Sequence, residues 1–132
     1  MRRLAQIAAA SGAFCLFAYA AAADANGRWK TETSGEGKYL VVEIGPCGDK
    51  TCGVIVDARN ISGASNPDYE HLGRNIISDM VQDGPNTWED GKIWAPDDDK
   101  TYSAEMELKG DVLAVEGCVV IICRGQDWTR VE

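Results

Sequence analysis

Histidine and positive charge are both scarce in this sequence. His71 is the only histidine in 132 residues, and 13 Lys and Arg stand against 21 Asp and Glu, for a formal net charge of −8. A serine or cysteine nucleophile needs a nearby base, so the sequence offers no basis for a hydrolytic triad, and we expect His71 at the surface. The negative charge disfavours nucleic acids and anionic membranes as partners, because both attract positive surfaces.

Long apolar runs are missing after residue 23. Residues 1–23 have the three parts of a secretory signal peptide, namely the positive charges of Arg2 and Arg3, an apolar stretch and an alanine-rich end. The apolar stretch is shorter than the roughly 20 residues of a membrane-spanning helix. We therefore predict cleavage near Ala23, a periplasmic or secreted location, and one mature domain over 24–132 that does not span a membrane.

Few cysteines are left after such cleavage, but they form two pairs of equal spacing. The four are Cys47, Cys52, Cys118 and Cys123. In an oxidising compartment such pairs become disulfides, and the sequence allows three connectivities. We favour Cys47 with Cys52 and Cys118 with Cys123, since each pair brackets a short turn. A zinc site is the alternative, but zinc usually takes closer cysteines with further Cys or His ligands, so no metal or other cofactor is predicted.

The mature chain has no long helical stripe of apolar residues, and its apolar residues alternate with polar ones. The clearest case is 102–109, where Tyr102, Ala104, Met106 and Leu108 alternate with polar residues. Gly, Pro, Asn and Asp clusters separate the alternating segments. About eight strands are predicted, over 28–33, 39–44, 53–57, 76–82, 92–95, 102–109, 112–117 and 127–131.

Short turns between successive strands indicate an antiparallel up-and-down arrangement. Closing such a sheet into a barrel removes its exposed edges, so we predict an all-β protein with one up-and-down barrel. A two-sheet sandwich is the alternative.

An ordered set of short motifs runs along the predicted barrel. It comprises Gly27-Arg28-Trp29, Cys47, Cys52-Gly53, Asn66-Pro67, Leu72-Gly73, Trp88, Gly91, Ile93, Pro96, Lys100-Thr101-Tyr102, Leu113, Gly117-Cys118, Gln126 and Trp128-Thr129-Arg130. This set resembles the bacterial secreted domain of unknown function 2147 family, whose members form lipocalin-like barrels. The resemblance implies that Trp29 plugs the barrel base and that Arg130 packs across it. It brings no established active residues, so no catalytic residue is carried over.

Aromatic residues are numerous for a chain of this length, and they suggest where a ligand would bind. Barrels of about eight strands either fill with side chains or hold one small ligand. If a cavity exists, we expect its wall to be formed by Trp88, Trp94, Tyr102, Met106 and Leu108, with Trp29 closing the base. The alternative is a core filled by these same residues.

Acidic residues give no clear reaction centre. Asp97, Asp98 and Asp99 are typical of a hairpin turn, and Glu105 and Glu107 fall on the polar face of a predicted strand. We therefore predict that the protein is not an enzyme.

Between the last two cysteines stand four apolar residues, Val119, Val120, Ile121 and Ile122, where a hairpin tip is usually polar. They belong either to the core or to an exposed apolar rim that binds a ligand tail, a second subunit or an envelope partner. The resulting hypothesis is a periplasmic or secreted lipocalin-like protein that binds a small apolar or amphipathic molecule without chemistry. The alternative is a solid-core barrel that acts through its surface as an envelope interaction or accessory protein.

Overall fold

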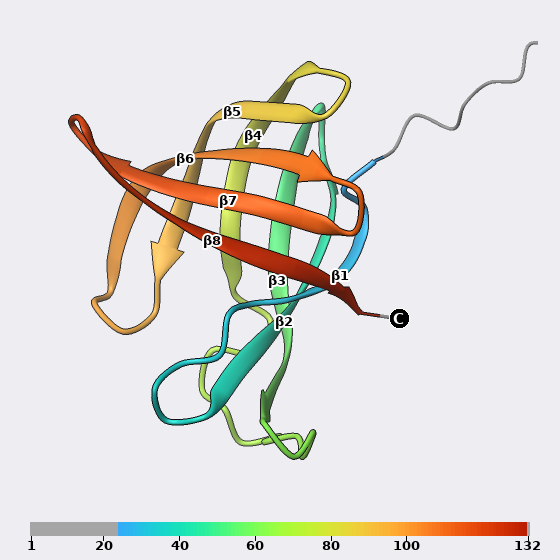
Figure 1. The fold of residues 1–132 in the computed structure, drawn as a ribbon, viewed down its shortest axis with the longest axis vertical. Coiled ribbons are helices and arrows are strands. Elements are labelled where there is room, and N and C mark those ends of the chain that lie inside the picture. Colours follow the sequence, from blue (N-terminus) through green and yellow to red (C-terminus); the bar gives the residue numbers. More distant parts are fainter. Residues whose placement is uncertain (1–23, 132) are drawn as a thin grey trace, which may run out of the picture.

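The computed structural model describes residues 24–131, which form eight β-strands (Figure 1). The predicted signal peptide, residues 1–23, lies outside the described residues. The strands are β1 (Gly27–Lys30), β2 (Lys38–Cys47), β3 (Lys50–Asn60), β4 (Asn75–Gly84), β5 (Thr87–Ala95), β6 (Lys100–Lys109), β7 (Val112–Val119) and β8 (Ile122–Val131). Over 24–131, no helix is long and apolar enough to cross a membrane.

The strands pair in chain order and close into one antiparallel barrel. The up-and-down barrel predicted from the alternation is therefore confirmed, and the sandwich alternative is not. Each short turn joins neighbours in the sheet, and the longer β3–β4 connection leads to a bulged β3–β4 pairing.

The barrel closes at a short seam between β1 and β8. Only three residue pairs join these strands, among them Trp29 opposite Arg130. β8 is ten residues long and β1 is four, so the part of β8 from Ile122 to Trp128 has a strand neighbour only on its β7 side. The carboxylate of Glu32 accepts one backbone N–H of this free edge, from Asp127, at 2.8 Å.

All eight predicted strands are present, and most are longer than the alternation suggested. One of the largest differences is in β8, which begins at Ile122 and not at residue 127. Residues 122–127 are all exposed in this strand. A strand with two exposed faces has no apolar–polar alternation, which is why the sequence pattern missed its first half.

Two disulfides join the predicted cysteine pairs, Cys47 with Cys52 and Cys118 with Cys123. The second pair lies directly across the β7–β8 hairpin, with Val119 opposite Ile122 beyond it. Local pairing follows from the fold, because the β2–β3 and β7–β8 turns lie at opposite ends of an up-and-down barrel.

The hydrophobic core consists mostly of aliphatic and tryptophan side chains, most of which point into the barrel. Its members are Ala25, Trp29, Val42, Ile44, Ile55, Ile76, Ile77, Met80, Trp88, Trp94, Ala104, Met106, Leu108, Leu113, Val115 and Trp128, with Leu40, Tyr69 and Ile93 packed against them.

Candidate functional site

One end of the barrel is closed by Trp29, whose side chain is fully buried. Its indole N–H donates to the Ala25 carbonyl at 2.8 Å. The Arg130 guanidinium carbon lies 4.2 Å from the centre of the Trp29 ring, and the same side chain donates to the carbonyls of Asn26 and Asp24. The packing of Arg130 on Trp29 expected from the family resemblance is therefore present, and it ties residues 24–26 across the base.

Four of the six predicted wall residues pack together in the barrel core. Trp29, Trp88, Met106 and Leu108 are at most 4% exposed, and Trp88 lies opposite Met106 in the β5–β6 register. Tyr102 lies further along the same face of β6 and is half-buried, with its hydroxyl donating to Asp98 at 3.4 Å. The four buried side chains therefore belong to the packed core of the barrel.

Glycines at inward positions indicate how closely this interior is packed. A Cβ atom added at Gly53 would lie 2.9 Å from Val42 Cγ1, and one at Gly117 would lie 3.0 Å from Ile93 Cγ2. Contacts this short do not occur without displacement of the neighbouring atoms. Even a methyl group has no room at these two places.

Trp94 is buried, but it lies on the other face of β5 from most of the predicted wall. Ile93 lies opposite the inward-facing Tyr102, whereas Trp94 lies opposite Thr101. Since successive side chains in a strand point to opposite faces, Trp94 points out of the barrel. The strand bulge between Trp88 and Gly91 shifts the alternation, which sequence spacing alone did not reveal.

The β3–β4 connection covers Trp94 with polar and aromatic side chains that the sequence did not single out together. The Arg74 guanidinium carbon lies 3.3 Å from the centre of the Trp94 ring, and the His71 ring packs edge-on at 4.8 Å. The indole N–H donates to Asp99 at 2.9 Å, and Arg74 also lies 3.8 Å from that carboxylate. His71, expected at the surface, is therefore a half-buried part of this cluster.

Tyr69 belongs to the same covering connection and packs against the core. Burial and the nearby carboxylates of Asp97 and Glu70 raise the pKa of its hydroxyl. A raised pKa keeps the phenol neutral, so it contributes packing and not charge.

Two of the depressions on the described surface are shallow and open. The first, about 230 Å³, lies beside the N-terminal segment and is lined by residues that include Asp24, Lys50 and Trp88. The second, about 190 Å³, lies between Glu32 and the β7–β8 hairpin. Both are smaller than the roughly 300–1,000 Å³ of ordinary small-molecule sites.

Acidic residues on the outside of the barrel form a mutually repelling group. The carboxylates of Asp83 and Asp90, followed by Glu105, raise the pKa of Glu89. Glu89 is fully exposed, so its charge is screened by water. Glu105 and Glu107 are exposed as predicted.

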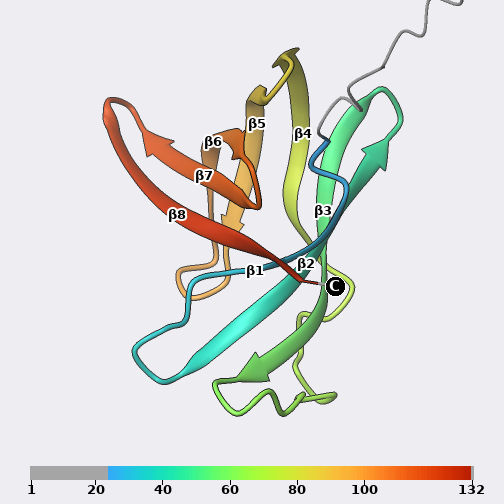
Figure 2. The same cartoon turned by 45° about the vertical axis from the view of Figure 1, so that its right-hand side comes forward.

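The tip of the β7–β8 hairpin is the most exposed apolar feature of the described chain. Val119, Val120, Ile121 and Ile122 are 52%, 93%, 90% and 69% exposed. Both ribbon views draw this hairpin extending beyond its neighbouring strands (Figures 1 and 2). We call these four residues the apolar tip. The interpretation of this segment as core is therefore wrong.

The backbone at the apolar tip is unusual for its sequence. Val120 has φ 55°, in the left-handed region where glycine and asparagine are normally found. A β-branched residue there destabilises the turn by about 1–3 kcal/mol. The sequence thus keeps a large apolar side chain at a position that favours glycine.

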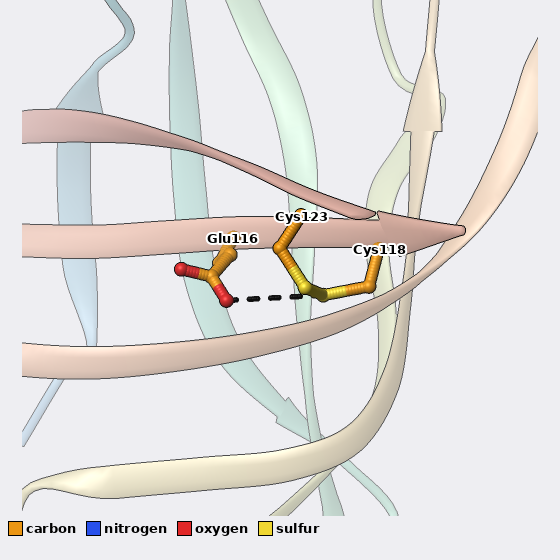
Figure 3. A group of neighbouring side chains, drawn as sticks. All are labelled: Glu116, Cys118 and Cys123. Carbon is orange, nitrogen blue, oxygen red and sulfur yellow. Dashed lines mark hydrogen bonds between the residues drawn. A yellow bond between two sulfur atoms is a disulfide. The ribbon is translucent and has the colours of Figure 1, made fainter. Parts of the chain in front are cut away.

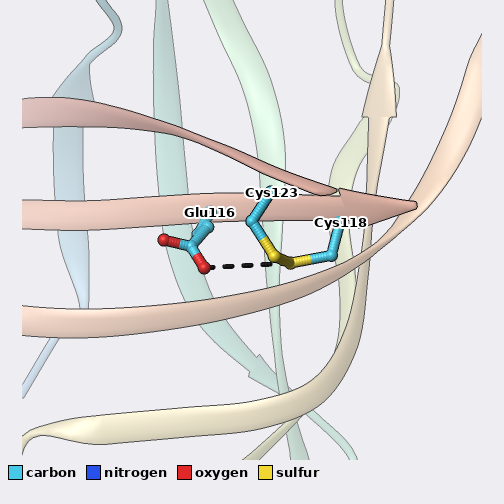
Figure 4. Close-up of a disulfide and its surroundings, with 3 residues drawn as sticks. All are labelled: Glu116, Cys118 and Cys123. Atoms are coloured by element: carbon cyan, nitrogen blue, oxygen red, sulfur yellow. Dashed lines mark hydrogen bonds between the residues drawn. A yellow bond between two sulfur atoms is a disulfide. The ribbon is translucent and has the colours of Figure 1, made fainter. Parts of the chain in front are cut away.

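Glu116, Cys118 and Cys123 lie together at the base of the apolar tip, with their potential ligand atoms within 4.8 Å of one another (Figure 3). A Glu116 carboxylate oxygen lies 3.8 Å from the Cys118 sulfur. The two sulfurs are bonded to each other (Figure 4), so neither is a thiolate able to bind a metal. The disulfide instead fixes the two strands where the tip begins.

The closed eight-stranded barrel with its Trp29–Arg130 base defines a lipocalin-like fold. Residues 27–130 match the family model described as an uncharacterized protein conserved in bacteria (DUF2147). The chain therefore belongs to this family, as its motifs indicated.

The chain is similar to two solved structures. One is protein HP1028 from Helicobacter pylori, described as belonging to the lipocalin family, with 18% identity, a TM-score of 0.66, and coverage of 83% of this chain and 84% of that one. The other is a Schistosoma mansoni fatty acid binding protein in complex with arachidonic acid, with 15% identity, a TM-score of 0.48, and coverage of 81% and 96%. A search of curated proteins gives no match.

Proposed function

We propose that this protein is a non-catalytic binding protein of the periplasm or cell exterior, and that its binding surface is the apolar tip. The single observation that carries this proposal is the exposure of four consecutive large apolar side chains on a disulfide-closed hairpin. Soluble proteins rarely leave contiguous apolar residues in water unless another apolar surface covers them. The position of the Cys118–Cys123 disulfide keeps the tip in one shape before it meets a partner.

From the sequence we draw the alternative hypothesis of a solid-core barrel that acts through its outer surface. That hypothesis agrees best with this geometry. Trp29, Trp88, Met106 and Leu108 are buried in one core cluster. A Cβ atom would be too close to Val42 at Gly53 and to Ile93 at Gly117. A guest in the barrel would therefore have to displace several packed side chains, which costs more than binding at a surface that is already exposed.

A second candidate function is carriage of a small apolar or amphipathic molecule inside the barrel. The observation that favours it is that Tyr69, which belongs to the β3–β4 connection and not to a strand, packs against the core. Connections open more readily than paired strands. A small molecule would therefore enter the barrel interior beneath this connection. The fold likeness to HP1028, described as a lipocalin, agrees with it.

Retention on a phenyl resin tests the first candidate. Ile121→Ser removes one side chain of the tip, and Ile61→Ser is the matched control, because Ile61 is 77% exposed elsewhere on the molecule. We expect Ile121→Ser to elute much earlier than the original protein at an unchanged melting temperature, and Ile61→Ser to elute only slightly earlier. Equal shifts for the two variants would show that the tip is not the dominant apolar surface.

Native mass spectrometry tests the second candidate. Protein purified without detergent is weighed intact, extracted with organic solvent and weighed again. A co-purifying molecule that remains bound in Ile121→Ser supports carriage in the interior. A bare protein mass supports binding at the surface.

A further inference from the structure

The geometry of the apolar tip points to its occupant: we propose that the tip docks on the surface of a zwitterionic phospholipid bilayer. This inference rests on the proposed function, that the tip is the binding surface, and adds what the tip binds. The size of the apolar tip, its backbone structure and the charges around it each support this inference.

The apolar tip is too small to hold a protein partner by itself. It exposes only four consecutive side chains on one hairpin, whereas a stable protein interface takes about 20–30 residues from each side. A stable protein interface buries about 800 Å² on each partner. A bilayer has no such requirement, because its fluid apolar region closes around a small convex projection of any shape.

The hairpin is already organised for shallow insertion. Val119 and Ile122 pair across it, Cys118 and Cys123 pair beneath them, and the disulfide joins the two strands. Backbone groups that are paired within the hairpin avoid most of the desolvation that an irregular loop would suffer at a membrane. Because the turn is held in one conformation, little conformational entropy is lost on docking.

The side chain of Val120 is retained at a position where glycine would be more stable. Its left-handed backbone and its 93% exposure mean that Val120 contributes neither turn stability nor core packing. An apolar environment outside the chain gives this side chain a role that the isolated protein lacks.

Charge around the tip suits zwitterionic headgroups. Residues 117–123 carry no charge, and the flanking residues are one acid, Glu116, and one base, Arg124. Arg124 offers donors to lipid phosphate, and the Glu116 carboxylate attracts the positively charged headgroup nitrogen. The whole chain has a net charge of −8, which repels anionic lipids.

A second copy of this chain is the rival occupant. The edge of β8 from Ile122 to Trp128 has no second strand neighbour, so two hairpins have free edges through which to pair. A second copy of the chain would bind in the absence of lipid, whereas a bilayer surface requires lipid, so experiments with and without lipid distinguish the two occupants.

Vesicle flotation tests the proposal, with phosphatidylcholine vesicles as the probe. We expect the original protein to float with the vesicles and the double variant Val120→Ser, Ile121→Ser to lose at least about tenfold in the partition coefficient, because it removes two apolar side chains from the inserted tip. Ile61→Ser should float like the original protein. Replacing part of the phosphatidylcholine with phosphatidylglycerol should reduce binding at low salt. The N-terminal residues are the same in every variant. A difference in flotation between two variants therefore reports on the apolar tip.

A tryptophan placed in the tip gives a second measurement. The fluorescence of Ile121→Trp should shift to shorter wavelength with vesicles and be quenched by brominated acyl chains. Circular dichroism and melting temperature should match the original protein in every variant. Flotation that is unaffected by Val120→Ser, Ile121→Ser would overturn the proposal.

Two further outcomes separate the occupant from the function. If phenyl retention depends on the tip but the protein does not float, the bilayer proposal is wrong and the proposed binding surface stands. If sedimentation velocity without lipid reveals a dimer that Ile121→Ser dissociates, a second copy of the chain is the occupant and the bilayer proposal is overturned.

Discussion

Arg130 and Trp29 lie opposite each other in the seam that closes the barrel, with the guanidinium carbon 4.2 Å from the centre of the indole ring. The same guanidinium donates to the carbonyls of Asn26 and Asp24. One side chain thus joins the last strand, the first strand and the segment that covers the base. The seam has only three residue pairs. The contact between Arg130 and Trp29 should therefore contribute more to the stability of the barrel than an ordinary surface contact does.

Arg130→Ala should destabilise the barrel by about 2 kcal/mol, because it removes the cation–π contact and two charge-assisted hydrogen bonds. Urea unfolding measures this loss. Arg130→Lys should recover only part of it, since an ammonium cannot stack flat on the ring while donating to both carbonyls. An unchanged urea midpoint for Arg130→Ala would mean that the rest of the seam suffices.

Gly53→Ala tests whether the interior is full. Its added methyl group would lie 2.9 Å from Val42 Cγ1 and 3.2 Å from Ile77 Cβ. Overpacking of this kind destabilises a fold by about 1–3 kcal/mol. Gly45→Ala is the control, because a methyl group at Gly45 meets no atom within 4 Å. If both variants have the stability of the original protein, the interior has room that the packing described above does not provide.

Val120→Gly should stabilise the protein by about 1 kcal/mol, because glycine adopts the left-handed backbone of this turn without strain. The same change should weaken binding through the apolar tip. Differential scanning calorimetry and vesicle flotation measure the two effects. A lower melting temperature would contradict the strain assigned to Val120.

Asp57 makes part of the stability depend on pH. Burial alone would raise the pKa of its carboxyl, but hydrogen bonds from Arg59, Ser65 and the Ala58 N–H hold that pKa below its usual value of 3.8. Protonation therefore favours the unfolded chain. The ionised carboxylate stabilises the fold above about pH 4, and this stabilisation is lost as the pH falls through the folded-state pKa.

Asp57→Asn should reduce stability at pH 7 by about 1 kcal/mol and have little effect near pH 2. Urea unfolding across this pH range gives the measurement. A constant difference between the two proteins at every pH would show that the contribution of Asp57 is not linked to its ionisation.

Much of the fold could be predicted because it depends on local features of the sequence, namely the alternation of apolar and polar residues and the spacing of the cysteines. Alternation located all eight strands, and the spacing of Cys118 and Cys123 predicted a disulfide across a hairpin. The exposed first half of β8 escaped because residues with two wet faces show no alternation.

The candidate site was harder to predict because it depends on bulges and on contacts distant in sequence. The bulge between Trp88 and Gly91 turns Trp94 to the outside, where His71 and Arg74 cover it. The apolar tip was visible in the sequence, but its burial was open to both interpretations. Glycines at positions 53 and 117 were the available signal for close packing at these two places, since glycine within a strand marks close approach of neighbouring atoms.

The central claim is that binding occurs at the apolar tip and not inside the barrel. An NMR titration with dodecylphosphocholine micelles tests it most directly, because the backbone amides of 119–122 and the indole N–H groups of Trp29 and Trp88 report on the two places separately. We predict large shifts at the tip amides and unchanged indole signals. Shifted indole signals with an unperturbed tip would contradict the account.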